Sequence, residues 1–224
     1  MKKKIILKSS ILAVAAGLSV FAINSVFADE LPVQFMGVND FHGALEQTGT
    51  ARLEGETVKN AGTAPLLATY LNDSQKDFET ENAGTPNASI RVQAGDMVGA
   101  SPANSALLQD EPTVKVFNEM NFEYGTLGNH EFDEGLGEFN RIMKGEAPTP
   151  GQFNKIVDEY PHEASKQEVV IANLVDKDTN KIPFDWKPYT IKEIPVNDKT
   201  VKVGFIGVVT TEFPNLVLRK NHEQ

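Results

Sequence analysis

Cysteine is absent from the sequence, and this absence limits both the fold and the chemistry. Without cysteine the protein has no disulfide framework, so its stability has to come from the burial of apolar side chains. Lipid anchoring through an N-terminal cysteine is excluded as well. Any metal site must use Asp, His, Asn, Glu or backbone oxygen, which favours cations such as manganese, magnesium, calcium or zinc.

Basic residues are also few relative to acidic ones, because the chain has 21 Lys and Arg against 31 Asp and Glu. Four of the basic residues and none of the acidic ones lie within residues 1–28. From residue 29 onward, 17 basic residues therefore face 31 acidic ones, a formal net charge of −14. A surface of this sign repels polyanions, so we expect no binding of nucleic acid polymers.

Long apolar runs are limited to the N-terminus. Four lysines within the first eight residues precede an apolar run from Ile11 to Ile23, and Ala28 ends a stretch of modest side chains. This order is typical of a secretory signal peptide cut after Ala28, so residues 1–28 are expected to direct export and the protein to be secreted or on the cell surface. An uncleaved membrane anchor is the competing interpretation, but the run is shorter than the roughly 20 residues that a spanning helix needs.

Residues 29–224 show alternating strand and helix patterns, which predict one α/β domain with a sizeable core. A loop rich in Gly and Thr precedes Thr63, which can cap a helix whose Leu66, Leu67, Tyr70 and Leu71 share one face. A second helix is predicted over 112–120. Apolar runs predict the strands, namely 33–38, 88–93, 122–127, 169–172 and 201–209, with a hairpin arm at 186–194.

Three predicted strands end in polar residues flanked by glycine: Asn39-Asp-Phe-His-Gly43, Gly95-Asp96 and Gly128-Asn-His-Glu-Phe-Asp133. In open α/β sheets the carboxyl ends of the strands are where ligands bind, so we expect the three motifs to meet. An Asp-x-His pair can hold one cation, and the amide oxygen of an Asn can be a ligand for a second.

Each motif also has an interpretation without a ligand. Asp40 and His42 fit an ordinary surface loop, and Asp96 fits a turn aspartate. Asp133 can accept a hydrogen bond from His130 and hold its tautomer, or it can cap a helix that begins near Glu134; the two roles are compatible. The occurrence of all three motifs in order, at three strand ends, favours a metal site.

These motifs resemble the first three metal motifs of the calcineurin-like metallophosphoesterases, specifically the secreted 5′-nucleotidase branch, which includes 2′,3′-cyclic-nucleotide phosphodiesterases. The resemblance covers nearly all of residues 33–215. It implies a four-layer α/β/β/α sandwich and two divalent metal ions, manganese, zinc or similar. It also implies the site residues: Asp40 and His42 on the first metal, Asp96 bridging both, Asn129 on the second, and His130 paired with Asp133 as the catalytic histidine.

The resemblance implies hydrolysis of phosphate esters of nucleotides by a metal-activated water. Two neighbouring cations lower the pKa of a water, orient the phosphate and offset its developing charge. An imidazolium at His130 would stabilise the same charge and protonate the leaving alkoxide.

The sequence departs from the family pattern after the third motif. Further family ligands come from an isolated histidine and a Gly-His-x-His segment, and only His162 and His222 remain here. We expect neither to be a ligand, because His162 fits an exposed loop or helix start and His222 lies in a charged tail. The family's C-terminal domain, which binds the nucleotide base, is missing too. The chain is therefore expected to be the N-terminal part of the catalytic domain of a longer enzyme, truncated at its C-terminal side and weak or inactive alone.

Two other functions stay open from the sequence. One is a non-catalytic secreted fragment or binding module that keeps the fold and weak metal binding. The other is a related phosphoesterase that acts on non-nucleotide esters.

Overall fold

A computed structural model describes residues 31–222 of the protein. The expected signal peptide, residues 1–28, lies outside the described residues. Four parallel strands form a sheet in the order β1-β4-β5-β6. The strands are β1 (Val33–Val38), β4 (Ala88–Gln93), β5 (Tyr124–Gly125) and β6 (Glu168–Val169).

The two longest strands of this sheet lie where their apolar runs predict them. β1 and β4 pair over their full lengths, from Val33 opposite Ala88 to Val38 opposite Gln93. Burial of apolar side chains such as Ile90, which is fully buried, holds them in place. β5 and β6 contain only two residues each, so the predictions of strands over 122–127 and 169–172 are right in position but too long.

The helix predicted after Thr63 is present as α1 (Ala64–Glu81), and the Thr63 hydroxyl accepts a hydrogen bond from the Leu66 N–H, 3.4 Å. The predicted apolar face is wrong in part, because Leu66 and Tyr70 are exposed. The helix instead turns the i, i+3, i+4, i+7 series toward the core, which is Ala64, Leu67, Ala68 and Leu71.

The predicted helix over 112–120 corresponds to α3 (Glu111–Glu119). A further amphipathic helix, α4 (Leu136–Lys144), buries Phe139, Ile142 and Met143. Short helical turns complete this part of the chain: α2 (Ala103–Ala106), η1 (His130–Phe132), α5 (Lys155–Asp158), η2 (Pro183–Asp185), α6 (Phe213–Leu216) and η3 (Arg219–Asn221).

Two antiparallel hairpins accompany the sheet. β7 (Tyr189–Val196) and β8 (Lys199–Ile206) match the hairpin arm and strand that the sequence predicts. β2 (Thr48–Leu53) and β3 (Glu56–Gly62) occupy the segment expected to be a Gly- and Thr-rich loop, so that prediction is wrong. The side chains of β3 are almost all exposed, so no hydrophobic alternation marks this hairpin in the sequence.

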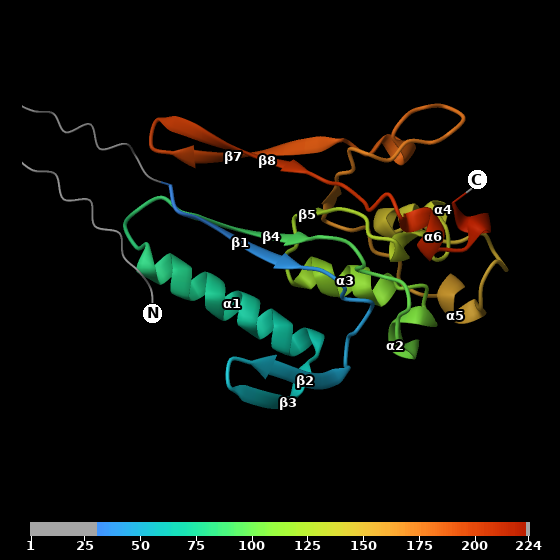
Figure 1. Ribbon diagram of the computed structural model, residues 1–224, viewed down its shortest axis with the longest axis horizontal. Coiled ribbons are helices and arrows are strands. Elements are labelled where there is room, and N and C mark those ends of the chain that lie inside the picture. Colours follow the sequence, from blue (N-terminus) through green and yellow to red (C-terminus); the bar gives the residue numbers. More distant parts are fainter. Residues whose placement is uncertain (1–30, 223–224) are drawn as a thin grey trace, which may run out of the picture. The chain divides into compact units, whose positions relative to one another are not determined.

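The sheet packs between helices and a hairpin (Figure 1). α1 and α3 lie on one side of β1 and β4, and the β7–β8 hairpin lies on the other. On the hairpin side, Ile194 and Val196 pack with Ile90 of β4. On the helix side, Phe117 of α3 contacts Phe41 and Phe122, with ring centroids 5.0 and 4.5 Å away. The α/β class expected from the sequence is therefore confirmed.

Among the helices of the described part of the chain, none combines the length and the apolar character that crossing a bilayer requires.

Candidate metal centre

The loops that follow β1 and β4 run side by side and carry the first two motifs. The backbone N–H groups of Asp40 and His42 donate to the carbonyl oxygens of Gly95 and Asp96, at 3.2 and 3.0 Å. A third bond joins the Gly43 N–H to the Met97 carbonyl, 3.2 Å. The pairing of β1 with β4 thus continues into both loops and holds their polar side chains at one end of the sheet.

Three of the predicted metal residues have left-handed backbone conformations. The φ angles of Asp40, His42 and Asp96 are 53°, 48° and 53°. Such conformations are uncommon for residues other than glycine and cost on the order of 1–3 kcal/mol each. They persist only where the surroundings impose them, and they concentrate at functional sites.

The structure brings His42, Asp96 and His130 together at the end of the sheet. One donor atom from each side chain lies within 4.8 Å of the other two, an arrangement that could hold a metal ion. The imidazole rings of His42 and His130 meet edge to face, with centroids 4.7 Å apart. Asp40 lies at the exposed rim, 3.7 Å from its Oδ1 to Nε2 of His42, and Asn129 is half-buried next to His130.

His42 has the tautomer that a metal ligand requires. Its Nδ1 lies 3.0 Å from the carbonyl oxygen of Gly99. A carbonyl only accepts, so Nδ1–H donates, and in the neutral imidazole Nε2 then keeps its lone pair. A second hydrogen bond of this kind commonly orients ligating histidines.

His130 is paired with Asp133, as the spacing in the third motif predicts. Nδ1 of His130 lies 2.7 Å from Oδ2 of Asp133. Burial lowers the pKa of His130, but the hydrogen bond that His130 donates to Asp133 and the charges of Asp133, Asp96 and Glu131 outweigh this effect, so the net pKa lies above its ordinary value. The alternative role of Asp133 as a helix cap is wrong, because α4 starts after Gly135 without a side-chain cap.

Asp96 connects the second motif to the third. Its Oδ1 accepts a hydrogen bond from the His130 backbone N–H, 2.9 Å. This bond fixes the orientation of the carboxylate and places it beside the imidazole pair.

Glu131 belongs to the site as well, although the sequence alone indicates no role for it. Its side chain is 1% exposed and accepts backbone N–H groups from Asp96, Met97 and Gly128, at 3.0, 2.8 and 2.6 Å. Burial raises its pKa to about 7, although the three N–H groups act in the opposite direction. A glutamate in a polar turn carries no sequence signal of burial, and only its position directly after Asn129-His130 points to the site.

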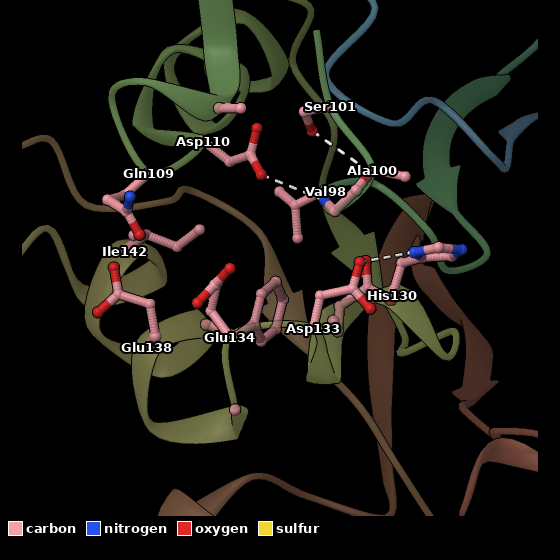
Figure 2. A pocket seen from close by; sticks show the side chains of 15 residues that line it. Val98, Ala100, Ser101, Gln109, Asp110, His130, Asp133, Glu134, Glu138 and Ile142 are labelled. Atoms are coloured by element: carbon pink, nitrogen blue, oxygen red, sulfur yellow. Dashed lines mark hydrogen bonds and ion pairs between the residues drawn. The ribbon is translucent and has the colours of Figure 1, made fainter. Parts of the chain in front are cut away.

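A cavity of about 110 Å³ lies beside the pair formed by His130 and Asp133 (Figure 2). Asp110, Asp133, Glu134 and Glu138 contribute carboxylates to its lining. In Figure 2 the Asp133 side chain lies against His130, and Asp110 accepts the Gly99 N–H at 3.2 Å. This acidic lining disfavours a phosphate group unless cations offset the charge.

The two remaining histidines lie outside the group formed by His42, Asp96 and His130. His162 was expected in an exposed loop, but its side chain is 12% exposed and Nδ1 bonds to Oε2 of Glu111 at 2.6 Å. His222 packs edge-on against Phe213, with centroids 6.1 Å apart. That neither histidine is a metal ligand stays a prediction.

Close contact between the second and third motifs gives a testable prediction. A Cβ added at Gly128 would lie 2.1 Å from Oδ1 of Asp96, whereas a Cβ at Gly137, in α4, meets nothing within 4 Å. Gly128→Ala should therefore displace the Asp96 carboxylate and weaken Mn²⁺ binding at least about 10-fold, measured by calorimetric titration. Gly137→Ala is the matched control and should bind Mn²⁺ normally with unchanged or slightly higher stability. Equal affinities in the two variants would contradict the proposed geometry.

No family model matches the sequence. Among curated proteins, the chain is 54% identical over 196 residues to the cell wall protein Lmo0130 of Listeria monocytogenes. It is 32% identical over 133 residues to a 2′,3′-cyclic-nucleotide 2′-phosphodiesterase/3′-nucleotidase of Salmonella typhimurium. These alignments cover 87% and 54% of this chain, but only 24% and 17% of the relatives. The chain thus spans a quarter or less of the length of either relative.

Solved structures with the same fold include the NAD nucleotidase of Haemophilus influenzae. It matches with a TM-score of 0.55 and 25% identity, over 79% of this chain and 26% of that protein. The calcineurin-like phosphoesterase YfkN of Bacillus subtilis matches with a TM-score of 0.54 and 22% identity, over 84% of this chain and 51% of that one. At that identity the second match supports the fold alone.

Proposed function

Because the chain belongs to the calcineurin-like metallophosphoesterases, in the branch of the 5′-nucleotidases and 2′,3′-cyclic-nucleotide phosphodiesterases, we propose that it is part of a hydrolase for phosphate esters of nucleotides. The observation that carries the proposal is the group of His42, Asp96 and His130, with donor atoms within 4.8 Å of one another. The hydrogen bond from His130 to Asp133 completes it.

The donor set fits divalent cations. All its atoms are nitrogen or oxygen, the ligands that manganese and zinc accept, and the Nε2 lone pair of His42 is available. We propose that Asp40, His42, Asp96 and Asn129 hold two such ions, with Asp96 between them. When bound, such ions would supply Lewis-acid stabilisation of the phosphate charge and activation of the attacking water.

In this proposal His130 is the catalytic acid. Asp133 holds its Nδ1–H and leaves Nε2 to face the reacting groups. The raised pKa increases the share of the imidazolium at a given pH, and that form can stabilise negative charge on the phosphate and transfer its proton to the leaving oxygen.

We propose that residues 29–224 form the N-terminal part of the catalytic domain and that a further, C-terminal domain of a longer protein binds the nucleotide. The short share of each relative that the chain spans supports this arrangement. Export to the cell surface is proposed because residues 1–28 fit a signal peptide and the Listeria relative is named a cell wall protein.

The direct test is phosphate release by purified residues 29–224. With Mn²⁺ we expect slow hydrolysis of AMP or 2′,3′-cyclic AMP that EDTA abolishes. The rate should be low, because the group within residues 31–222 contains few donors for two ions. Mn²⁺ binding without any EDTA-sensitive hydrolysis would favour the non-catalytic binding module. Faster hydrolysis of p-nitrophenyl phosphate than of either nucleotide would favour a phosphoesterase for other esters, and rapid release from AMP would contradict the expected weakness of this chain.

A further inference from the structure

Glu131 is a buried carboxylate whose three hydrogen-bond donors within residues 31–222 are all backbone N–H groups. It lies in η1, between His130 and Phe132. Removing a charged group from water is unfavourable unless its lone pairs accept hydrogen bonds. A carboxylate that is only 1% exposed therefore indicates that the backbone N–H groups around it need a hydrogen-bond acceptor.

The donors to Glu131 come from two different loops. Asp96 and Met97 follow β4, and Gly128 follows β5. One oxygen, Oε2, accepts from both loops at once, 3.0 Å from the Asp96 nitrogen and 2.6 Å from the Gly128 nitrogen. Glu131 therefore fastens the second motif to the third.

The backbones of the two loops also approach each other closely at Gly95 and Gly128. A Cβ at Gly95 would lie 2.6 Å from the Gly128 nitrogen. The His130 N–H reaches Oδ1 of Asp96 across the same junction, 2.9 Å. A small shift between the loops would therefore move the Asp96 carboxylate relative to the His130 imidazole.

A carboxylate is the only ordinary side chain of this length with acceptors at both ends. A glutamine in the same position has one oxygen, and its NH₂ group would face a backbone N–H. Either the Met97 N–H or the shared pair from Asp96 and Gly128 would then lose its acceptor. Loss of an acceptor for a buried N–H is costly and would favour separation of the loops.

We propose that Glu131 is a positioning residue of the metal centre, which holds the Asp96 carboxylate and the Asn129–His130 segment at the separation that cation binding requires. The inference rests on the proposed function, because it takes the group around Asp96 to be a metal site. Glu131 itself touches no substrate; it acts through the two loops.

The test is the Mn²⁺ affinity of Glu131→Gln in residues 29–224, measured by calorimetric titration alongside thermal unfolding. We expect the dissociation constant to rise about 10- to 100-fold, as is typical when a group that orients a ligand is lost. Glu111→Gln is the matched control, because Glu111 is 4% exposed and bonds to Arg141 and His162 rather than to the motif loops. Both variants should lose stability, but only Glu131→Gln should lose Mn²⁺ affinity.

Wild-type affinity in a folded Glu131→Gln variant would overturn the inference. Failure of the wild-type chain to bind Mn²⁺ would instead contradict the proposed function, so the two failures are distinguishable. If Glu131→Gln does not fold, amide hydrogen exchange of the wild-type apoprotein decides. Slow exchange at Asp96, Met97 and Gly128 supports the hydrogen bonds from these N–H groups to Glu131, and fast exchange at the three amides excludes them.

Discussion

Replacement of His130 by Gln is expected to lower kcat for nucleotide hydrolysis by about 10²- to 10⁴-fold, the contribution typical of a general acid, while bound metal changes little. Glutamine keeps a polar side chain of similar length but cannot carry the proton that the leaving oxygen needs. Phosphate release gives kcat, and elemental analysis of the same sample gives the metal content.

His162→Gln is the control for this experiment. His162 is also a largely buried histidine paired with a carboxylate, here Glu111, but it lies outside the group formed by His42, Asp96 and His130. The control should lose some stability and keep kcat. Loss of metal from His130→Gln would show that His130 is itself a ligand, an arrangement that its position beside His42 and Asp96 would permit.

The second large effect is expected from Asp96→Asn, which should weaken the binding of both cations at least about 100-fold. This exceeds the 10- to 100-fold loss typical of residues that only orient ligands, because a charged ligand proposed to bridge both ions becomes neutral. The asparagine oxygen can still accept the His130 N–H, so the local backbone should be retained. Mn²⁺ titration of residues 29–224 measures the change.

Asp110→Asn provides a comparison of the same chemistry. Asp110 also has a left-handed backbone, with φ 59°, and also accepts a backbone N–H, from Gly99. The Asp110→Asn variant should bind Mn²⁺ with nearly the affinity of the unmodified chain. If Asp96→Asn still binds two equivalents of metal, Asp96 does not bridge the two ions.

Much of the candidate site follows from local chain chemistry. β1 contains Val33, Phe35, Met36 and Val38, β4 contains Ile90 and Val92, and polar residues beside glycine follow each strand, so both the strands and the convergence of the motifs are predictable. The hydrogen bond between His130 and Asp133 is predictable too, because residues three apart face each other in a helical turn such as η1. The division of roles among these residues stays a prediction.

Other features depend on neighbours that are distant in sequence. The face of α1 that is buried is set by the sheet beneath it, so Tyr70 points outward although it fits the apolar pattern. His162 is covered because Glu111, 51 residues earlier, accepts its hydrogen bond. Most side chains of β3 in the β2–β3 hairpin are exposed, so the sequence shows no alternation of apolar and polar residues there.

The sequence by itself determined the α/β class, the three motifs and the residues able to hold a cation, because these depend on side-chain chemistry and on spacing along the chain. Only the tertiary structure decided that Glu131 is buried between two loops and that His42, Asp96 and His130 share one site. The burial of a side chain and its distance from other side chains are set by the segments that pack against it. These segments are distant in sequence, so the residues next to it in the chain do not reveal them.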